Sequence, residues 1–438
     1  MIDDTHDPAR RSWVASADGH ADFPIQNLPL GLFDREGEAR PGVAIGDQIL
    51  DLKAAAEHGL YTGLAAEAVA RGGGEGRLNG LLSLGAPARL ALRAQTSALL
   101  DVGAAETAGL RRAVEACLVA ADGVAMLTPT RIGDYTDFYA GLNHARNVGR
   151  LFRPDNPLPV NYRAVPIGYH GRANTVRVSG TPVRRPSGQI RPDPEGAPIY
   201  APTRALDFEL ELAIWLAGGD GSAEPVPMAD AGAQIAGFGL LNDWSARDVQ
   251  AWEYVPLGPF LAKNFHTTVS PWIVTPEALA PFRAAQPPRA PEDPKPLDYL
   301  HDALDQARGA LAVELRVELS TERMRAAGMA PVLLSRGSTL DLYWTPAQMV
   351  AHHTSGGCPL AAGDLFGSGT ISGPTPESLG SLIELTAGGR QPVRLPTGEQ
   401  RTYLLAGDEV VFGAHARRDG FVGIGFGACV GRVVDPPG

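Results

Sequence analysis

The clearest alternation of hydrophobic and polar positions lies at residues 206–212, where the sequence reads LDFELEL. Side chains of a β-strand point alternately to its two faces, so this pattern predicts a strand with one acidic face. That face carries Asp207, Glu209 and Glu211, and no lysine or arginine interrupts it. Such a face is more often a solvated sheet edge than a metal site, and the choice depends on whether other carboxylates join it.

Elsewhere the pattern predicts strands joined by tight turns at residues 23–52. Leu and Ala at helical spacing predict helices at 88–100 and 104–120. Further strand candidates between turn signals indicate a large, mainly β domain. They lie at 176–178, 206–215, 311–319, 410–412 and 422–430. Six prolines at 281–297 predict an exposed excursion.

The length of 438 residues predicts two domains, because single hydrophobic cores stop growing near about 250–300 residues. We place the boundary near residue 120, which gives domains 1–120 and 121–438. Hydrophobic residues make up 44% and charged residues 20% of the chain. These values are typical of a soluble globular protein and argue against disorder.

Net charge argues against one class of partner. The chain carries a formal charge of −11 without a basic run, which disfavours nucleic acid and leaves small molecules or proteins as the expected partners. Neither a signal peptide nor a membrane span is expected from the hydropathy pattern. Cys117, Cys358 and Cys429 lie far apart and are expected to be buried, reduced thiols, which favours a cytoplasmic protein.

Further carboxylates stand where they could join the acidic face of 206–212. Asp134 and Asp137 lie beside aromatic residues, and Asp243 follows the apolar run 238–241, where a strand would end. Carboxylate oxygens without a Cys or His pair suit Mg²⁺, Ca²⁺ or Mn²⁺ rather than zinc. The sequence therefore favours a divalent-metal site over a solvated edge.

Two other residues could carry chemistry near such a metal. His144 stands in a segment typical of a helix start, with Asn143 as a candidate cap. A lone histidine is usually structural, but an imidazole beside a metal site can act as a general base, because it titrates near working pH. Lys263 lies in an apolar context, where it either reaches solvent or serves as a buried electrophile.

Five motifs are specific enough to indicate a family. They read IGDYTDFY (132–139), GYHGR (168–172), LNDWSARD (241–248), WEYVPLGPF (252–260) and SGTISGP (368–374). Together with DFPIQNLP at 22–29, they resemble the fumarylacetoacetase family over nearly the whole chain. The resemblance implies a mainly β (α+β) fold, with a small N-terminal SH3-like barrel and a large C-terminal mixed β-roll domain. It also implies that the large domain houses the active site and forms a homodimer.

The resemblance further implies a role for each matching residue. The metal ligands, for Mg²⁺ or Ca²⁺ with Mn²⁺ as a further fit, would be Asp137, Glu209, Glu211 and Asp243. His144 would be the base that activates water, oriented by Glu384, and the oxyanion would be stabilised by Arg247, Gln250 and Lys263. The substrate would be held by Tyr139, Arg153, Tyr169, Tyr254 and Thr370. Asp207 is then expected to support the site rather than to bind the metal.

The implied activity is hydrolysis of a carbon–carbon bond in a small 1,3-diketo acid, 4-fumarylacetoacetate, to fumarate and acetoacetate, the last step of tyrosine and phenylalanine catabolism. Such a bond breaks when water adds to a ketone and the departing carbon leaves as an enolate, which requires a base, an oxyanion site and a Lewis acid. The alternatives are another acylpyruvate or diketo-acid hydrolase, a keto-acid decarboxylase of the same superfamily, and a non-catalytic metal-binding scaffold.

Overall fold

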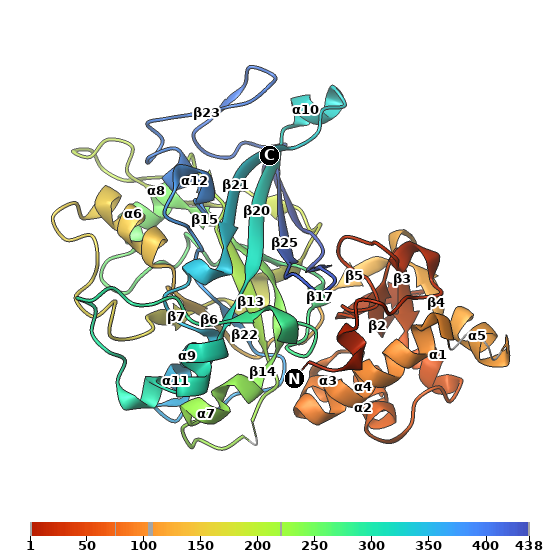
Figure 1. Ribbon diagram of the computed structural model, residues 1–438. Coiled ribbons are helices and arrows are strands. Elements are labelled where there is room, and N and C mark those ends of the chain that lie inside the picture. The colour runs from red at the N-terminus through yellow and green to blue at the C-terminus, as the bar shows by residue number, and fades with distance from the viewer. Residues whose placement is uncertain (1, 75, 104–107, 220, 437–438) are drawn as a thin grey trace.

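A computed structural model of the chain describes residues 2–74, 76–103, 108–219 and 221–436. The N-terminal part, drawn in red and orange, lies beside a larger part that contains the rest of the chain (Figure 1). Among the described residues, no helix is both long and apolar enough to cross a membrane.

The N-terminal part is one antiparallel sheet covered by helices (Figure 1). The predicted strands of 23–52 are confirmed, and the sheet order is β17-β1-β2-β3-β4, with β5 also paired to β1. Its strands are β1 Leu30–Arg35, β2 Glu38–Ile45, β3 Gln48–Asp51, β4 Leu118–Ala120, β5 Ala125–Leu127 and β17 Trp272–Ile273. Its helices are α1 Leu52–Glu57, α2 Gly63–Gly74, α3 Asn79–Leu82, α4 Gly85–Leu100 and α5 Ala108–Glu115. The SH3-like barrel stays a prediction.

The helix predicted at 88–100 is confirmed as the body of α4. The one predicted at 104–120 is only partly correct. Residues 104–107 lie outside the described residues, α5 covers 108–115, and 118–120 form β4. The domain boundary near residue 120 stays a prediction, since the N-terminal sheet also takes in β5 and β17 from the later part of the chain.

Two further sheets, one of seven strands and one of six, form the centre of the larger part. The first has the order β7-β6-β22-β13-β14-β16-β8, and the second β21-β20-β25-β27-β9, with β26 on β25. The first contains β6 Tyr135–Phe138, β7 Gly168–His170, β8 Val176–Val178, β13 Leu210–Leu216, β14 Ile235–Asp243, β16 Thr267–Val269 and β22 Leu365–Gly367. The second contains β9 Val183–Arg184, β20 Val313–Ser320, β21 Val332–Ser338, β25 Glu409–Ala416, β26 Ile424–Gly425 and β27 Cys429–Val434. Phe208 and Phe412 meet edge to face in the core between them, with ring centroids 5.9 Å apart.

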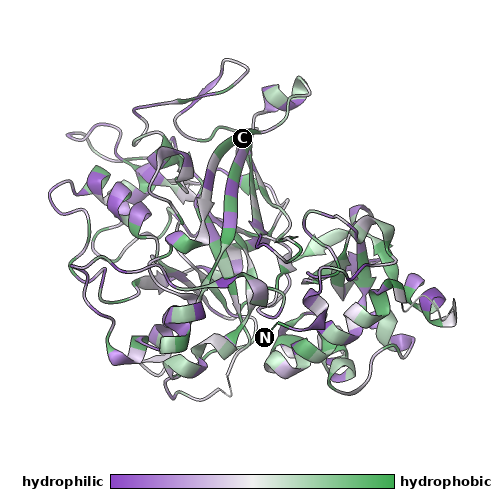
Figure 2. Ribbon diagram, in the orientation of Figure 1, coloured by the Kyte–Doolittle hydropathy of each residue, from purple (hydrophilic) through white to green (hydrophobic). Residues whose placement is uncertain are grey.

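Helices and short hairpins surround these sheets. The helices are α6 Leu142–Phe152, α7 Met228–Ala231, α8 Arg247–Glu253, α9 Ala303–Arg308, α10 Glu322–Ala326, α11 Pro346–Thr354 and α12 Leu382–Leu385. The two-stranded pairs are β10 Ser187–Ile190 with β11 Ile199–Pro202, β12 Leu206–Asp207 with β15 Ser245–Ala246, β18 Arg283–Ala284 with β19 Ala310–Leu311, and β23 Val393–Arg394 with β24 Gln400–Arg401. Hydrophilic residues concentrate on several of these outer helices, such as α6 (Figure 2).

The strand predicted at 206–215 is two strands with a break between them. β12 ends at Asp207, β13 begins at Leu210, and Glu209 forms only an isolated bridge with Ser381. β13 lies between β14 and β22, and all of its residues are buried because hydrophobic clusters pack on both of its faces. The acidic face is therefore not a solvated sheet edge, because neighbouring strands flank it and the core covers it.

Three other expectations need correction. Residues 422–430 do not form one strand. They contain the short strand β26, a loop and the first two residues of β27. The excursion at 281–297 begins buried, because Pro281 and Phe282 belong to the core and only the part from 285 onward is largely exposed. Cys358 is exposed, whereas Cys117 and Cys429 are buried as predicted.

Candidate metal and active site

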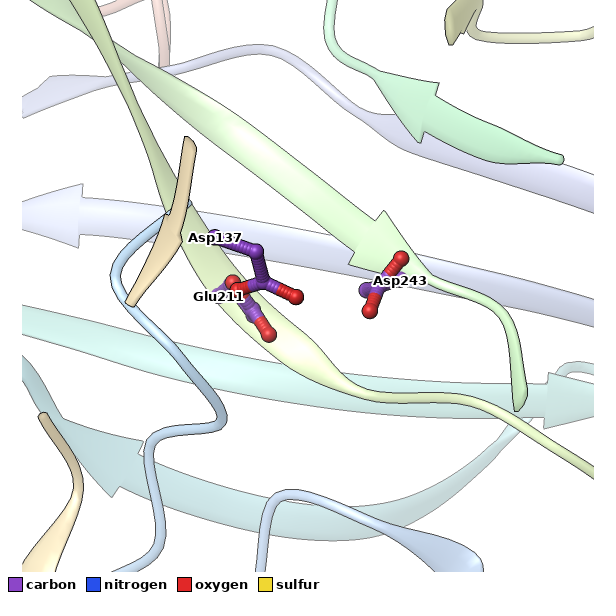
Figure 3. A group of neighbouring side chains, drawn as sticks. All are labelled: Asp137, Glu211 and Asp243. Atoms are coloured by element: carbon purple, nitrogen blue, oxygen red, sulfur yellow. The ribbon is translucent and has the colours of Figure 1, made fainter. Parts of the chain in front are cut away.

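Three carboxylates from three neighbouring strands converge in the large domain (Figure 3). Asp137 lies on β6, Glu211 on β13 and Asp243 at the end of β14. One oxygen of each lies within 4.8 Å of an oxygen of the other two, and all three side chains are buried. β13 pairs directly with β14 and is linked to β6 through β22, so sheet register brings together residues that are far apart in sequence.

Burial and mutual repulsion raise the pKa values of these carboxyls. For Asp137 burial is the largest cause and the negative charge of Asp243 the next. For Glu211 burial again comes first, followed by the charge of Asp137. Asp137 Oδ1 and Glu211 Oε1 are buried and have no hydrogen-bond partner among the described residues. Such unpaired oxygens fit a hard divalent cation, which would supply the missing positive charge.

The glycine-rich segment after β22 contributes a backbone donor to this group. Gly369 N–H donates to Glu211 Oε2 at 2.9 Å. Gly369 has a φ of +78°, and a Cβ there would collide with the carbonyl oxygen of Phe138. Only glycine therefore lets the backbone come this close to the carboxylates. Tyr169 donates its hydroxyl to Asp137 Oδ2 at 2.5 Å from the other side.

Glu209, the fourth predicted ligand, lies beside this group and is held by two cations. Lys263 Nζ is 2.5 Å from Glu209 Oε2, and Arg247 Nη2 is 2.8 Å from Oε1. Burial opposes ionisation of Glu209, but the ammonium and guanidinium charges lower its pKa below the usual range. Lys263 Nζ also lies 2.6 Å from Asp243 Oδ2, so one ammonium links Glu209 to the group of three. The role of Glu209 as a ligand stays a prediction.

A buried histidine–carboxylate pair lies next to Glu209. His144 Nδ1 is 2.6 Å from Glu384 Oε2, and His144 Nε2 is 3.8 Å from Glu209 Oε1. Contact with the carboxylate fixes the imidazole so that Nε2 faces the acidic group. Although burial opposes ionisation, His144 and the hydroxyl and amide donors around Glu384 lower the pKa of its carboxyl.

Several residues that hold this pair are not evident from the sequence. Glu384 Oε2 accepts hydrogen bonds from Ser372 and Ser381 at 2.8 and 2.6 Å. Glu384 Oε1 accepts one from Asn147 at 2.9 Å. Asn143, the candidate cap of α6, instead donates to the Ser372 carbonyl oxygen, and Gly141 occupies the N-cap position. The bonds of Asn147 and Asn143 join segments more than two hundred residues apart, so no local pattern could indicate them. Ser381 and Ser372 are nearer, 3 and 12 residues before Glu384.

Asp207 supports the site, as expected, and does so through two elements. Its carboxylate accepts the backbone N–H groups of Leu382 and Ile383, the first residues of α12, at 2.7 and 3.1 Å. It also accepts the Arg247 Nε–H at 2.8 Å. Asp207 therefore fixes the short helix that carries Glu384 together with the guanidinium that reaches Glu209.

Comparison with known proteins agrees with this arrangement. Residues 26–129 match the fumarylacetoacetase N-terminal family model, and residues 135–434 match the fumarylacetoacetate (FAA) hydrolase C-terminal model. The chain belongs to the fumarylacetoacetase family. It is 46% identical over 421 residues to the fumarylacetoacetase of Bos taurus, with 94% of this chain and 96% of the relative covered. It is 44% identical to that of Homo sapiens, with the same coverage, and 42% identical to that of Arabidopsis thaliana, with 96% and 97% covered.

The other residues matched to the fumarylacetoacetase family divide into two groups by position. Tyr139 meets the His144 ring edge to face at 5.8 Å, and Thr370 has a buried hydroxyl without a hydrogen-bond partner among the described residues. Gln250 accepts from Arg247 Nη1 at 3.0 Å. Arg153 and Tyr254 lie farther out, at the ends of α6 and α8.

Arg153 and Tyr254 each contact a residue near the end of α6. Arg153 Nη2 is 3.5 Å from the Pro157 carbonyl oxygen. The ring of Tyr254 lies 6.2 Å from that of Phe152, the last residue of α6. α6 therefore connects the outer pair to His144, which lies on the same helix.

Proposed function

We propose that this enzyme hydrolyses the carbon–carbon bond of 4-fumarylacetoacetate and releases fumarate and acetoacetate, the last step of tyrosine and phenylalanine catabolism. Membership of a family of carbon–carbon bond hydrolases supports the reaction type. The observation that carries the proposal is the juxtaposition of a histidine–carboxylate pair with a buried group of carboxylates. A base beside a metal-binding group is what addition of water to a ketone requires.

His144 is the general base in this proposal. Its Nδ1 is held by Glu384 at 2.6 Å, and its Nε2 faces Glu209 and the acidic group. As Nε2 takes a proton from water, the imidazole gains a positive charge that the Glu384 carboxylate stabilises. The three donors that hold Glu384 keep that carboxylate ionised and in place.

Asp137, Glu211 and Asp243, together with Glu209, would hold Mg²⁺ or Ca²⁺, and Mn²⁺ is compatible with the same oxygen ligands. When bound, such a cation supplies Lewis-acid stabilisation of the enolate charge. The unpaired buried oxygens of Asp137 and Glu211 support this assignment.

Arg247, Gln250 and Lys263 are proposed to receive the developing oxyanion. Arg247 and Lys263 are both buried and both contact Glu209, which keeps two positive charges fixed beside His144. Preorganised charges of this kind stabilise a transition state without reorganisation. The substrate is proposed to be held by Tyr139, Arg153, Tyr169, Tyr254 and Thr370. Arg153 suits a terminal carboxylate, because a guanidinium binds it bidentately.

The proposal also covers the oligomeric state, the cellular location and the type of the N-terminal fold. We infer a homodimer, a cytoplasmic protein and an SH3-like N-terminal barrel from family membership. The three cysteines are free, in keeping with a reducing compartment. Size-exclusion chromatography with light scattering tests the dimer, and a monomer at micromolar concentration would contradict it.

Loss of the diketone absorbance of 4-fumarylacetoacetate in the presence of Mg²⁺ or Ca²⁺ tests the activity. No turnover with either ion would refute the proposal. A panel that includes acylpyruvates and oxaloacetate separates the rival reactions, since a larger kcat/KM for one of those substrates would assign the chain to another keto-acid activity. Turnover of any of them excludes a non-catalytic scaffold.

A further inference from the structure

A cavity of about 440 Å³ opens beside α6. Three arginines line it: Arg146 and Arg150 from the helix, and Arg163 from the segment that follows. The lining segment 156–160 carries no charge. Arg146 follows His144 by two residues, which is about 200° around an α-helix, so the cavity lies behind the face that carries the histidine.

The two helical arginines form an unbalanced positive charge. Arg146 and Arg150 are one helical turn apart, a spacing at which like charges destabilise a helix. Neither forms an ion pair with any residue that the structure describes. Asp155, the one acidic residue of the adjoining loop 154–161, does not pair with them either. This surplus lies in a chain whose formal net charge is −11.

The third arginine is fixed in position by the proline-rich segment. Arg163 Nη1 lies 3.0 Å from Asp293 Oδ1, and the Asp293 side chain is only 2% exposed. Arg289 lies 4.3 Å above the Tyr343 ring and donates to the Arg163 carbonyl oxygen at 3.0 Å. The Nε of Arg163 is buried and has no hydrogen-bond partner among the described residues. Asp293 therefore fixes the guanidinium of Arg163 in the cavity wall, and Arg146 and Arg150 supply the charge that no acidic residue of the described chain balances.

We propose that this cavity binds a small dianion, such as a dicarboxylate or an inorganic oxyanion. The planar guanidinium fork matches the paired oxygens of carboxylate and of tetrahedral oxyanions, and a dianion offsets the charges of Arg146 and Arg150 together. The site is distinct from the active site, because His144 and Asn147 face Glu384 from the other side of α6. An occupant relieves the repulsion within the helix that positions the base.

Isothermal titration calorimetry of the full-length, metal-loaded protein tests the proposal, with sulfate and succinate as probes. The Arg146→Gln/Arg150→Gln variant should bind the probe at least about tenfold more weakly than wild type. The Arg146→Lys/Arg150→Lys variant keeps both charges but loses the planar guanidinium groups. Its affinity for the probe should lie between those of wild type and the double glutamine variant. Binding of both probes indicates a general dianion site, and binding of succinate alone a dicarboxylate site.

The matched control is Arg112→Gln/Arg323→Gln. It removes the same net charge from two exposed arginines on α5 and α10, which lie away from α6 (Figure 1). Its affinity should stay within about twofold of wild type, because binding to a specific site does not follow net charge. Equal weakening in both double variants would overturn the proposal, as would no binding of either probe.

A single active-site variant separates the two sites. The His144→Asn variant should bind the probe with an affinity within about twofold of wild type, because the imidazole of His144 faces away from the cavity. Loss of binding in His144→Asn, with binding retained in Arg146→Gln/Arg150→Gln, would place the dianion in the active site and refute a separate cavity.

Discussion

Replacing Glu384 by glutamine removes the negative charge that faces His144 and keeps the size of the side chain. All four side chains that hydrogen-bond the carboxylate can act as donors: His144 Nδ1, Ser372 and Ser381 at Oε2, and Asn147 at Oε1. A glutamine amide has one acceptor oxygen and one NH₂ group. With the glutamine oxygen at the position of Oε2, the NH₂ group faces Asn147, whose side-chain amide can turn so that its oxygen accepts the hydrogen bond. The substitution therefore removes the charge with little loss of hydrogen bonding.

The catalytic cost follows from the lost charge. When His144 takes a proton, the imidazolium is no longer stabilised by a carboxylate 2.6 Å away. A loss of about 3–5 kcal/mol in the transition state corresponds to a kcat about 10²- to 10⁴-fold lower. KM and bound-metal content should change little, because Glu384 lies outside the group formed by Asp137, Glu211 and Asp243.

The assay is steady-state hydrolysis of 4-fumarylacetoacetate, with metal content measured on the same sample. Ser381→Ala is the matched control, because it removes one neutral donor to the same oxygen and leaves the charge in place. It should lower kcat by less than about tenfold. A Glu384→Gln enzyme with kcat within about threefold of wild type would remove this carboxylate from the mechanism.

The same substitution should change how stability depends on pH. The pKa of Glu384 is lowered in the folded protein, although burial opposes ionisation, because His144 and the surrounding donors favour the charged form. Its contribution to stability is therefore present above the ordinary carboxyl pKa and is lost as pH falls through the folded value. Wild type should lose stability over that acidic range faster than Glu384→Gln in urea unfolding. Parallel pH profiles would contradict the assignment.

Three further predictions concern other parts of the molecule. Glu211→Gln should weaken Mg²⁺ binding at least about tenfold in calorimetry, and unchanged affinity would contradict the metal assignment. Lys263→Met should lower kcat by about 10² or more, since it removes a fixed positive charge beside Glu209; near-normal kcat would exclude that role. Arg89 forms a buried ion pair with Glu277 at 3.0 Å. Arg89→Ala breaks this pair and should lower the free energy of unfolding by about 3–5 kcal/mol, with kcat unchanged. If urea unfolding shows a loss of stability below about 1 kcal/mol, the ion pair does not have the predicted role.

Alternation along 206–212 indicated both strand character and an acidic face, but not the break at residues 208 and 209. Glu209 N–H bonds to the Asn242 side chain, and Leu210 N–H to the Gly380 carbonyl oxygen. These partners come from distant segments, and the hydrophobic pattern continues through the break. The break turns Asp207 toward α12 and Glu209 toward Lys263, although the period of two places both on the face of Glu211.

The convergence of Asp137, Glu211 and Asp243 depends on sheet order, which the sequence did not specify. Each acid could be assigned to a strand or strand end, but only the pairing of β13 with β14 and β22 brings the three together. The family motifs indicated which residues belong to the site. Ser372 stands in the motif at 368–374 and Ser381 precedes α12, but the sequence does not show that both hydroxyls donate to Glu384, because that contact depends on how the loop before α12 folds back.

The central claim is that the acidic group and the His144–Glu384 pair together cleave a carbon–carbon bond of a diketo acid. Proton NMR of the reaction with 4-fumarylacetoacetate tests it most directly, before and after the divalent metal is removed by a chelator and restored. We expect equimolar fumarate and acetoacetate from the metal-loaded protein, no products after chelation, and recovery when Mg²⁺ or Ca²⁺ is added. Products that form at the same rate without metal, or a decarboxylated product in their place, would contradict the account.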